Sequence, residues 1–254
     1  MVVRAALLPP ISLQDLERTA ALTSRVDRKY LVTTEVSLAL VDSLSSHAIL
    51  TIDGQIEFAY ESVYFDTPDR LLHRQTAQRR RRRFRVRTRH YAHSDTTMLE
   101  VKVKGARGMT IKHRHLVPNT LHGRLDPEGH NFIRNVLGDR SALDQLDYLE
   151  PTLTTRYRRL TIVDSEAGTR FTHDRQVQAE AIDGRVIEIA GVIVETKTPN
   201  GASAADRWLW AAGRRPLRFS KYCTMLAELE PNLPRNKWHS TLSRSDIGQA
   251  HGSP

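Results

Sequence analysis

The chain of 254 residues contains a single cysteine, Cys223, and no apolar run near the roughly 20 residues that a membrane-spanning helix needs. One cysteine excludes an internal disulfide, which fits a reducing compartment. The apolar stretch at residues 5–8 is too short for a signal peptide, and acidic residues soon follow it. We therefore expect a cytoplasmic protein, whose basic surface is also compatible with a membrane protein partner.

Signatures of nucleic-acid binding and of zinc binding are also missing. Aromatic residues, which stack on bases, make up only 6% of the chain, and no RRM, KH or zinc-finger motif is present. His113 and His115 have no third ligand at metal spacing. Gly105-x-x-Gly108 lacks the Gly-Lys-Ser/Thr ending of a P-loop. Nucleic acid is thus a disfavoured partner, and the five consecutive arginines at residues 79–83 are interpreted first as a solvated basic segment.

What the chain has in excess is positive charge. Lysine and arginine number 38 against 29 acidic residues, giving a net charge of +9 and a pI of about 10.0. This balance indicates an anionic partner: nucleic acid, an acidic membrane surface or a polyphosphate. Residues 83–89 place an arginine at every second position, so a strand there would carry guanidinium groups on one face. Arginine matches phosphate oxygens with paired hydrogen bonds.

Periodicity and turn residues predict a mixed set of elements. Helices are expected at residues 12–25, 33–44, 126–137, 203–212 and 220–229, and strands at 27–32, 56–65, 82–91, 98–104, 109–116, 152–164, 170–178 and within 186–198. A hairpin connection is expected at residues 105–108. We predict an α+β fold, an antiparallel β-barrel tunnel of about eight strands with flanking helices. It would form one domain over residues 1–235, followed by a disordered tail at 236–254.

Most of the expected strands pair an apolar face with a charged, mainly cationic face. Two arrangements satisfy this pattern. The apolar faces form the centre and leave the charges in water, or helices cover the apolar faces and the charges point into a central tunnel. The second needs a bound anion or internal carboxylates, because unpaired buried charges are costly. Periodicity alone leaves both arrangements open.

The order of motifs adds a resemblance to this pattern. The motifs are Asp27-Arg28-Lys29-Tyr30, Ser62-Val63-Tyr64-Phe65-Asp66-Thr67, Arg85-x-Arg87, Leu99-Glu100-Val101-Lys102-Val103-Lys104, Lys112-x-Arg114, Tyr157-Arg158-Arg159, Arg170-Phe171-Thr172-His173-Asp174, Val194-Glu195-Thr196-Lys197 and Phe219-Ser220-Lys221-Tyr222. In this order and spacing, residues 24–229 resemble the VTC domain, the polyphosphate polymerase domain of the triphosphate tunnel metalloenzyme (CYTH-like) superfamily.

The resemblance implies a tunnel with inward-pointing charges, a divalent metal (Mn²⁺ or Mg²⁺), and transfer of the ATP γ-phosphate onto a growing polyphosphate chain. It implies that phosphates are held by Lys29, Arg85, Arg87, Lys102 or Lys104, Lys112, Arg159, Arg170, Lys197 and Lys221, with Arg114, Tyr157, Arg218 and Ser220 as further substrate contacts. Arg218 stands where the family often has lysine.

Carboxylates are the expected metal ligands. The resemblance assigns the metal to Glu195, with Glu100 as a second candidate, while Asp174 is a further ligand or a turn residue. Taken alone, Glu195-x-Lys197 also fits an ordinary ion pair, and Ser220 also fits a helix cap. The superfamily often opens with Glu-x-Glu-x-Lys, but residues 25–29 lack at least one of these acids. This departure weakens the case for a two-metal triphosphatase and favours the VTC branch. The alternatives to the polymerase are a triphosphatase or polyphosphatase on the same fold and a non-catalytic polyphosphate- or RNA-binding module.

Overall fold

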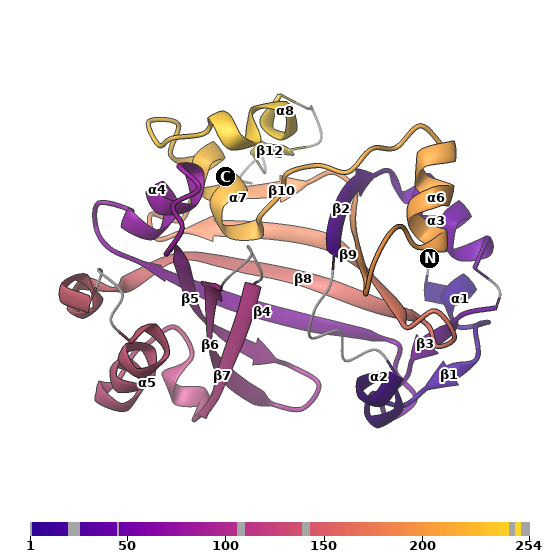
Figure 1. Cartoon of the computed structure of the whole chain (residues 1–254), viewed down its shortest axis with the longest axis horizontal. Coiled ribbons are helices and arrows are strands. Elements are labelled where there is room, and N and C mark those ends of the chain that lie inside the picture. Colours follow the sequence, from indigo (N-terminus) through magenta and orange to yellow (C-terminus); the bar gives the residue numbers. More distant parts are fainter. Residues whose placement is uncertain are drawn as a thin grey trace. The chain divides into compact units, whose positions relative to one another are not determined.

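The structure, a computed structural model, describes residues 2–19, 26–44, 46–105, 110–138, 143–243 and 247–249. Its strands are β1 (Pro10–Ile11), β2 (Val26–Val32), β3 (Ala48–Leu50), β4 (Glu57–Asp66), β5 (Phe84–Tyr91), β6 (Thr96–Lys104), β7 (Thr110–Val117), β8 (Glu150–Asp164), β9 (Thr169–Ala181), β10 (Val186–Ile189), β11 (Val192–Thr198) and β12 (Ile247–Gln249). Its α-helices are α1 (Val2–Ala5), α2 (Leu13–Thr19), α3 (Thr34–Asp42), α4 (Leu71–Ala77), α5 (Pro127–Leu137), α6 (Ala204–Ala211), α7 (Lys221–Leu229) and α8 (His239–Leu242). The fold is α+β, as predicted (Figure 1). The connection predicted at 105–108 and the end of the first predicted helix lie largely outside the described residues.

The strands form one large, mainly antiparallel sheet. Hydrogen bonds join them in the order β12-β10-β9-β8-β4-β5-β6-β7, and β11 pairs with both β9 and β2. Within the described ranges this order does not close on itself, so the predicted closed barrel of about eight strands is wrong: the sheet has twelve strands and free edges. The edge strand β7 carries Lys112 and Arg114, and charged side chains on an edge disfavour further strand pairing.

The predicted helix starts are confirmed by their caps. The Asp126 carboxylate accepts a hydrogen bond from the Gly129 amide at 2.7 Å at the start of α5, where Pro127 is the first helical residue. Ser203 forms a reciprocal capping box with Asp206 at the start of α6. Each cap satisfies an amide that the first helical turn leaves unpaired, which explains why the helices begin there.

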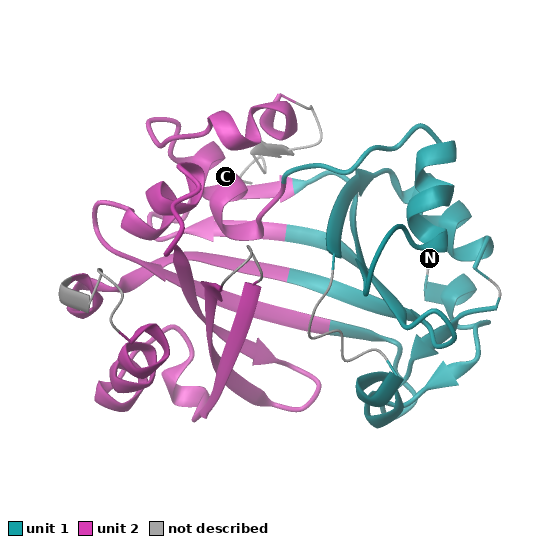
Figure 2. Ribbon diagram, in the orientation of Figure 1, with its two compact units in different colours: residues 1–58, 157–177, 189–218 teal, residues 59–156, 178–188, 219–254 magenta. Residues whose placement is uncertain are grey.

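Two compact units make up the chain (Figure 2). Unit 1 contains Met1–Phe58, Tyr157–Val177 and Ile189–Arg218, and unit 2 contains Ala59–Arg156, Gln178–Glu188 and Phe219–Pro254. Each unit has a hydrophobic cluster of its own, in which helices pack on one face of its strands. The long strands β8 and β9 contribute residues to both units.

The predicted disordered tail begins with ordered structure. A 3-10 turn at Asn236–Trp238 leads into α8. The Trp238 side chain is buried, and the centre of its ring lies 5.4 Å from the centre of the His73 ring of α4. Residues 236–243 are therefore helical rather than disordered, because Trp238 supplies an apolar anchor. Most of the remaining tail lies outside the described residues.

In the described part of the chain, no helix is both long and apolar enough to cross a membrane.

Candidate functional site

Neighbouring strands of unit 2 carry a charged face built from two rows of side chains. Strand register places Arg85 of β5 opposite Lys102 of β6, and Lys102 opposite Lys112 of β7. The next row contains, from β4 to β7, Tyr64, Arg87, Glu100 and Arg114. Directly opposed side chains lie on the same side of a sheet. The two rows therefore form one surface, which we call the unit 2 face.

Helices cover the opposite side of these strands. Phe84 and Val101 pack in one buried cluster with Leu72 of α4 and with Ile133 and Leu137 of α5. Of the two arrangements that the alternating pattern left open, unit 2 thus adopts the one in which helices bury the apolar side. The positive charges on the other side of these strands must then be compensated by internal carboxylates or by a bound anion.

Glu100 supplies part of that compensation. Arg87 donates from Nε to Glu100 Oε2 at 2.8 Å, while Arg114 Nε and Lys112 Nζ lie 3.3 and 3.4 Å from Oε1. The Tyr91 hydroxyl donates to the same carboxylate at 3.3 Å. Burial acts to raise the pKa of Glu100, but the surrounding cations hold that pKa well below its usual value. Glu100 is therefore a buried anion in a cationic surface.

Cations still outnumber carboxylates on the unit 2 face, where one glutamate faces three arginines and two lysines. Nearby Arg87 together with burial holds the pKa of Lys102 well below its usual value. Burial is also the main reason that the pKa of Lys112 falls to about 7. A lysine pKa falls when its positive charge is poorly compensated, so this surface would be stabilised by a bound anion.

The start of α7 joins the unit 2 face. Ser220 caps the helix by accepting a hydrogen bond from the Cys223 amide at 3.3 Å, and Arg85 Nη1 donates to the same hydroxyl at 3.0 Å. Lys221 is the first residue of the helix. The two interpretations of Ser220, a helix cap and a site residue, are therefore compatible. The positive end of the helix dipole adds to the cationic character here.

Unit 1 carries a second charged face, the unit 1 face. The register aligns Lys29 of β2 with Glu195 of β11 and with Thr172 of β9. A second row contains, across the same strands, Asp27, Lys197 and Arg170. The other side of these strands is again apolar, where Tyr30, Phe171 and Val194 pack in a cluster with residues of α3 and α6.

Carboxylates on the unit 1 face differ in how tightly they are bound. Asp174 accepts two hydrogen bonds from Arg159, at 2.6 Å from Nε and 2.8 Å from Nη2. The same guanidinium lies 5.1 Å from the centre of the Tyr157 ring. Glu195 forms longer ion pairs, at 4.0 Å to Lys29 Nζ and 3.7 Å to Lys197 Nζ. Burial lowers the pKa of Lys197 to about 8.

These contacts test the predicted metal ligands. No group of three or more His, Cys, Asp or Glu side chains in the described ranges is arranged to hold a metal ion. Glu100 and Asp174 are engaged by arginine, whereas the ion pairs of Glu195 with Lys29 and Lys197 are longer. Glu195 also faces Thr172, whose buried hydroxyl has no hydrogen-bond partner. Mg²⁺ and Mn²⁺ need few protein carboxylates when water and phosphate oxygens complete the shell. The residues therefore fit an ion held by Glu195 and by a substrate.

The remaining predicted residues lie at the margins of these faces. Lys104 pairs with Thr110 one row beyond Lys102, so Lys102 is the lysine aligned with Arg85 and Lys112. Arg114 is about half exposed at the edge strand, with 48% of its side chain accessible. Arg218 is exposed.

Sequence reasoning missed Tyr64 of the unit 2 face, and Ser62 and Arg89 in the next row beside it. Arg87 Nη1 donates to the Tyr64 hydroxyl at 3.1 Å, and Arg89 Nε donates to Ser62 Oγ at 3.0 Å. Arg89 continues the alternation of arginines along the strand, so the sequence alone could have placed it on this side of the sheet. Ser62 and Tyr64 could be placed only by knowing which strand pairs with β5.

Comparison with known proteins identifies a family and solved structures of similar fold. The VTC domain family model matches residues 24–230. A Bacillus halodurans protein titled "putative adenylate cyclase" is similar in fold, with 16% identity over 77% of this chain and 93% of that one and a TM-score of 0.50. A Hippeastrum protein titled "putative adenylyl cyclase" with a dominant triphosphatase activity has 15% identity over 83% and 97% of the chains and a TM-score of 0.49. No curated protein matches the sequence.

The family match covers most of the chain, and many charged residues of the motifs that carried the resemblance lie on the two charged faces. The chain belongs to the VTC domain family.

Proposed function

We propose that the protein is a metal-dependent phosphotransferase that moves the γ-phosphate of ATP onto a polyphosphate chain. The observation that carries this proposal is the pair of cationic faces, each on strands whose apolar side is buried by helices. Such faces suit a substrate with a row of negative charges. The tunnel expected of the family is part of the proposal.

Phosphoryl transfer depends mainly on positioning and on stabilisation of negative charge. On the unit 2 face, Arg85, Arg87, Lys102 and Lys112 would hold phosphate oxygens, with Ser220 and Lys221 at the start of α7. On the unit 1 face, Lys29, Arg159, Arg170 and Lys197 would do the same. The fixed pairing of Arg87 with Glu100 and of Arg159 with Asp174 keeps each guanidinium oriented before the substrate binds.

Glu195 is the residue proposed to hold the divalent cation. When bound, such an ion neutralises charge on phosphate oxygens and on the departing ADP. The chain's own contribution is a carboxylate between Lys29 and Lys197, whose ammonium groups would turn to phosphate oxygens. The end of a polyphosphate, or a free phosphate, is the proposed nucleophile, so no serine, cysteine or histidine nucleophile is needed. A cytoplasmic location and a membrane-bound partner stay predictions of the sequence.

Incubation of pure protein with ATP and Mn²⁺ tests the proposal. A polyphosphate ladder on a stained gel, formed together with ADP, is the expected result. Phosphate released without polymer would show instead that water is the acceptor and that the protein is a triphosphatase. Neither product, with salt-sensitive binding of polyanions, would mean a binding module without catalysis.

The lowered lysine pKa predicts that substrate binding takes up protons. Because the pKa of Lys112 is about 7 in the free protein, this amine is mostly neutral at pH 8. A bound phosphate favours the ammonium form, so tripolyphosphate should bind with net proton uptake at pH 8, and its affinity should fall as the pH rises above 7. Calorimetry in two buffers of different ionisation enthalpy measures this uptake.

Lys112→Arg is the matched control, because arginine keeps its charge throughout this range. We expect this variant to bind tripolyphosphate with less proton uptake and with a flatter pH dependence. Equal uptake in both proteins would show that Lys112 does not face the phosphates.

A further inference from the structure

A pocket extends the unit 2 face by one row toward α4. It is lined by Thr76, Arg83, Phe84, Arg85, Lys102, Val103, Lys104 and Thr110. Arg85 and Lys102 belong to the first row of the face, and the Lys104 amide donates to the Arg83 carbonyl at 3.3 Å one step farther along. The described lining thus contains four cationic side chains and no carboxylate.

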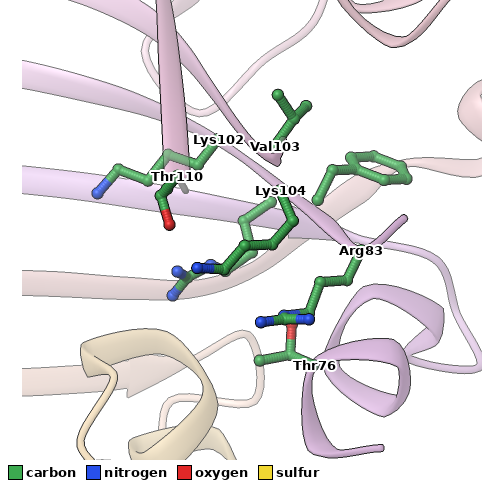
Figure 3. Close-up of a pocket in the computed structure, with 8 residues that line it drawn as sticks. Thr76, Arg83, Lys102, Val103, Lys104 and Thr110 are labelled. Carbon is green, nitrogen blue, oxygen red and sulfur yellow. The ribbon is translucent and has the colours of Figure 1, made fainter. Parts of the chain in front are cut away.

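Thr76 of α4 gives the pocket a polar group without a partner. Its side chain is buried, with the residue 5% exposed, and its hydroxyl makes no hydrogen bond. Figure 3 shows the Thr76, Arg83 and Lys104 side chains among those that line this pocket. A buried hydroxyl without a partner costs free energy unless a ligand satisfies it. Together with four cations, it indicates an oxyanion as that ligand.

Arg83 and its neighbours keep this region positive. Arg83 Nη1 donates to the carbonyls of Arg79 and Arg80, at 3.3 and 2.7 Å, which folds residues 79–83 back on themselves. Burial together with Arg85 and Arg79 lowers the pKa of Arg83. Lys237 Nζ donates to the Thr76 carbonyl at 2.9 Å and adds a further cation on the α4 side.

Outside the pocket, Arg79, Arg80, Arg81 and Arg82 are exposed. No tyrosine, tryptophan or phenylalanine lies within residues 66–83, so this segment offers no platform on which bases could stack. It also has no exposed large apolar side chain for insertion into a membrane. Closely spaced guanidinium groups alone suit an inorganic chain of phosphates.

We propose that the pocket at Thr76, Arg83 and Lys104, with the exposed arginines at residues 79–82, binds a stretch of polyphosphate that continues beyond the unit 2 face. The inference rests on the proposed function in taking polyphosphate as the chain. It adds that affinity depends on chain length: tripolyphosphate is too short to occupy both regions, whereas a long chain contacts both.

The test uses the triple variant Arg80→Gln, Arg81→Gln and Arg82→Gln. Its charge-matched control is Arg18→Gln, Arg124→Gln and Arg207→Gln, which removes three exposed arginines elsewhere. Binding of tripolyphosphate and of long-chain polyphosphate is measured over a range of salt concentrations. We expect the triple variant to bind the long chain about 10- to 100-fold more weakly than wild type and tripolyphosphate nearly as well. Its salt slope for the long chain should be lower by about 2.

Thr76→Val tests the pocket itself. It keeps the shape of the side chain and removes only a hydroxyl that has no partner, so thermal stability should be maintained. Binding of the long chain should weaken by about tenfold, as for a lost hydrogen bond to a charged group.

The inference is wrong if wild type binds both lengths equally per molecule, or if the triple variant and its control lose the same affinity. It is also wrong if RNA or vesicles of anionic lipid bind the arginine segment more tightly than long-chain polyphosphate does. Failure of the proposed function looks different: wild type would make no polymer from ATP, and the length-dependent binding would persist.

Discussion

Replacing Glu195 by glutamine should reduce metal-dependent turnover of ATP by at least about a hundredfold while the protein stays folded. Glu195 is a charged residue of the unit 1 face whose ion pairs are loose, at 3.7 and 4.0 Å. Glutamine keeps the size of the side chain and one oxygen, but it cannot supply the negative charge that holds a divalent cation. The loss therefore falls on the metal-dependent step.

The same substitution should affect stability little. Glu195 forms ion pairs with Lys29, which is partly accessible, and with the buried Lys197, whose pKa is already about 8. Removing the carboxylate lets that lysine release its proton rather than remain as an unpaired charge. Thermal unfolding followed by circular dichroism should give nearly the same midpoint for variant and wild type.

Two measurements separate metal binding from a general loss of charge. Titration with Mn²⁺ in the presence of a non-hydrolysable ATP analogue should show a weaker apparent affinity in Glu195→Gln. The control Glu166→Gln changes an exposed turn residue and should keep full activity. Full activity in Glu195→Gln would contradict both the metal assignment and the mechanism built on it.

The sequence predicted the charged faces because side chains alternate along a strand. Arg85 and Arg87 share a face whatever the rest of the chain does, and so do Glu195 and Lys197. What one strand cannot reveal is its neighbour. The contact of Arg87 with Tyr64 depends on which strands pair and in which register, and periodicity specifies neither.

The role of carboxylates was the hardest part to predict. Glu100 was a second metal candidate because magnesium and manganese prefer carboxylate oxygens, yet the structure engages it with Arg87, Lys112 and Arg114. Helix caps were easier, since Asp126 and Ser203 act within a few residues of their own position. Local sequence rules therefore located the helices and strands. Whether the sheet closes depends on which strands form its edges, and no local rule describes that.

Glu100→Gln should cause the largest loss of stability among single substitutions on the unit 2 face, about 3–5 kcal/mol in the free energy of unfolding. The Glu100 side chain is fully buried and contacts three cations. Removing one partner of a buried ion pair leaves the others uncompensated, which costs more than the pair contributed. For a chain of this size, the unfolding midpoint should fall by about 10 °C. Glu128→Gln, which removes an exposed carboxylate near His115, should cost less than about 1 kcal/mol.

The Glu100 carboxylate also makes the folding stability of the wild-type protein depend on pH. Its pKa is held below 4.5 in the folded protein, so its contribution is complete above that pH and is lost as the pH falls toward the lowered value. Glu100→Gln lacks this acid-dependent contribution, and its stability should change less between pH 6 and pH 3. Urea unfolding at several pH values measures the difference.

A second substitution and a bound ligand test whether uncompensated positive charge causes the loss of stability in Glu100→Gln. Adding Arg114→Met to Glu100→Gln removes one stranded guanidinium group, which cannot release its proton, and should recover part of the lost stability, because contacting residues are energetically coupled. Tripolyphosphate should raise the unfolding midpoint of Glu100→Gln more than that of wild type, since bound phosphate supplies the missing negative charge. If the variant instead keeps the stability of wild type and gains nothing extra from tripolyphosphate, Glu100 is not the internal counter-ion of the unit 2 face.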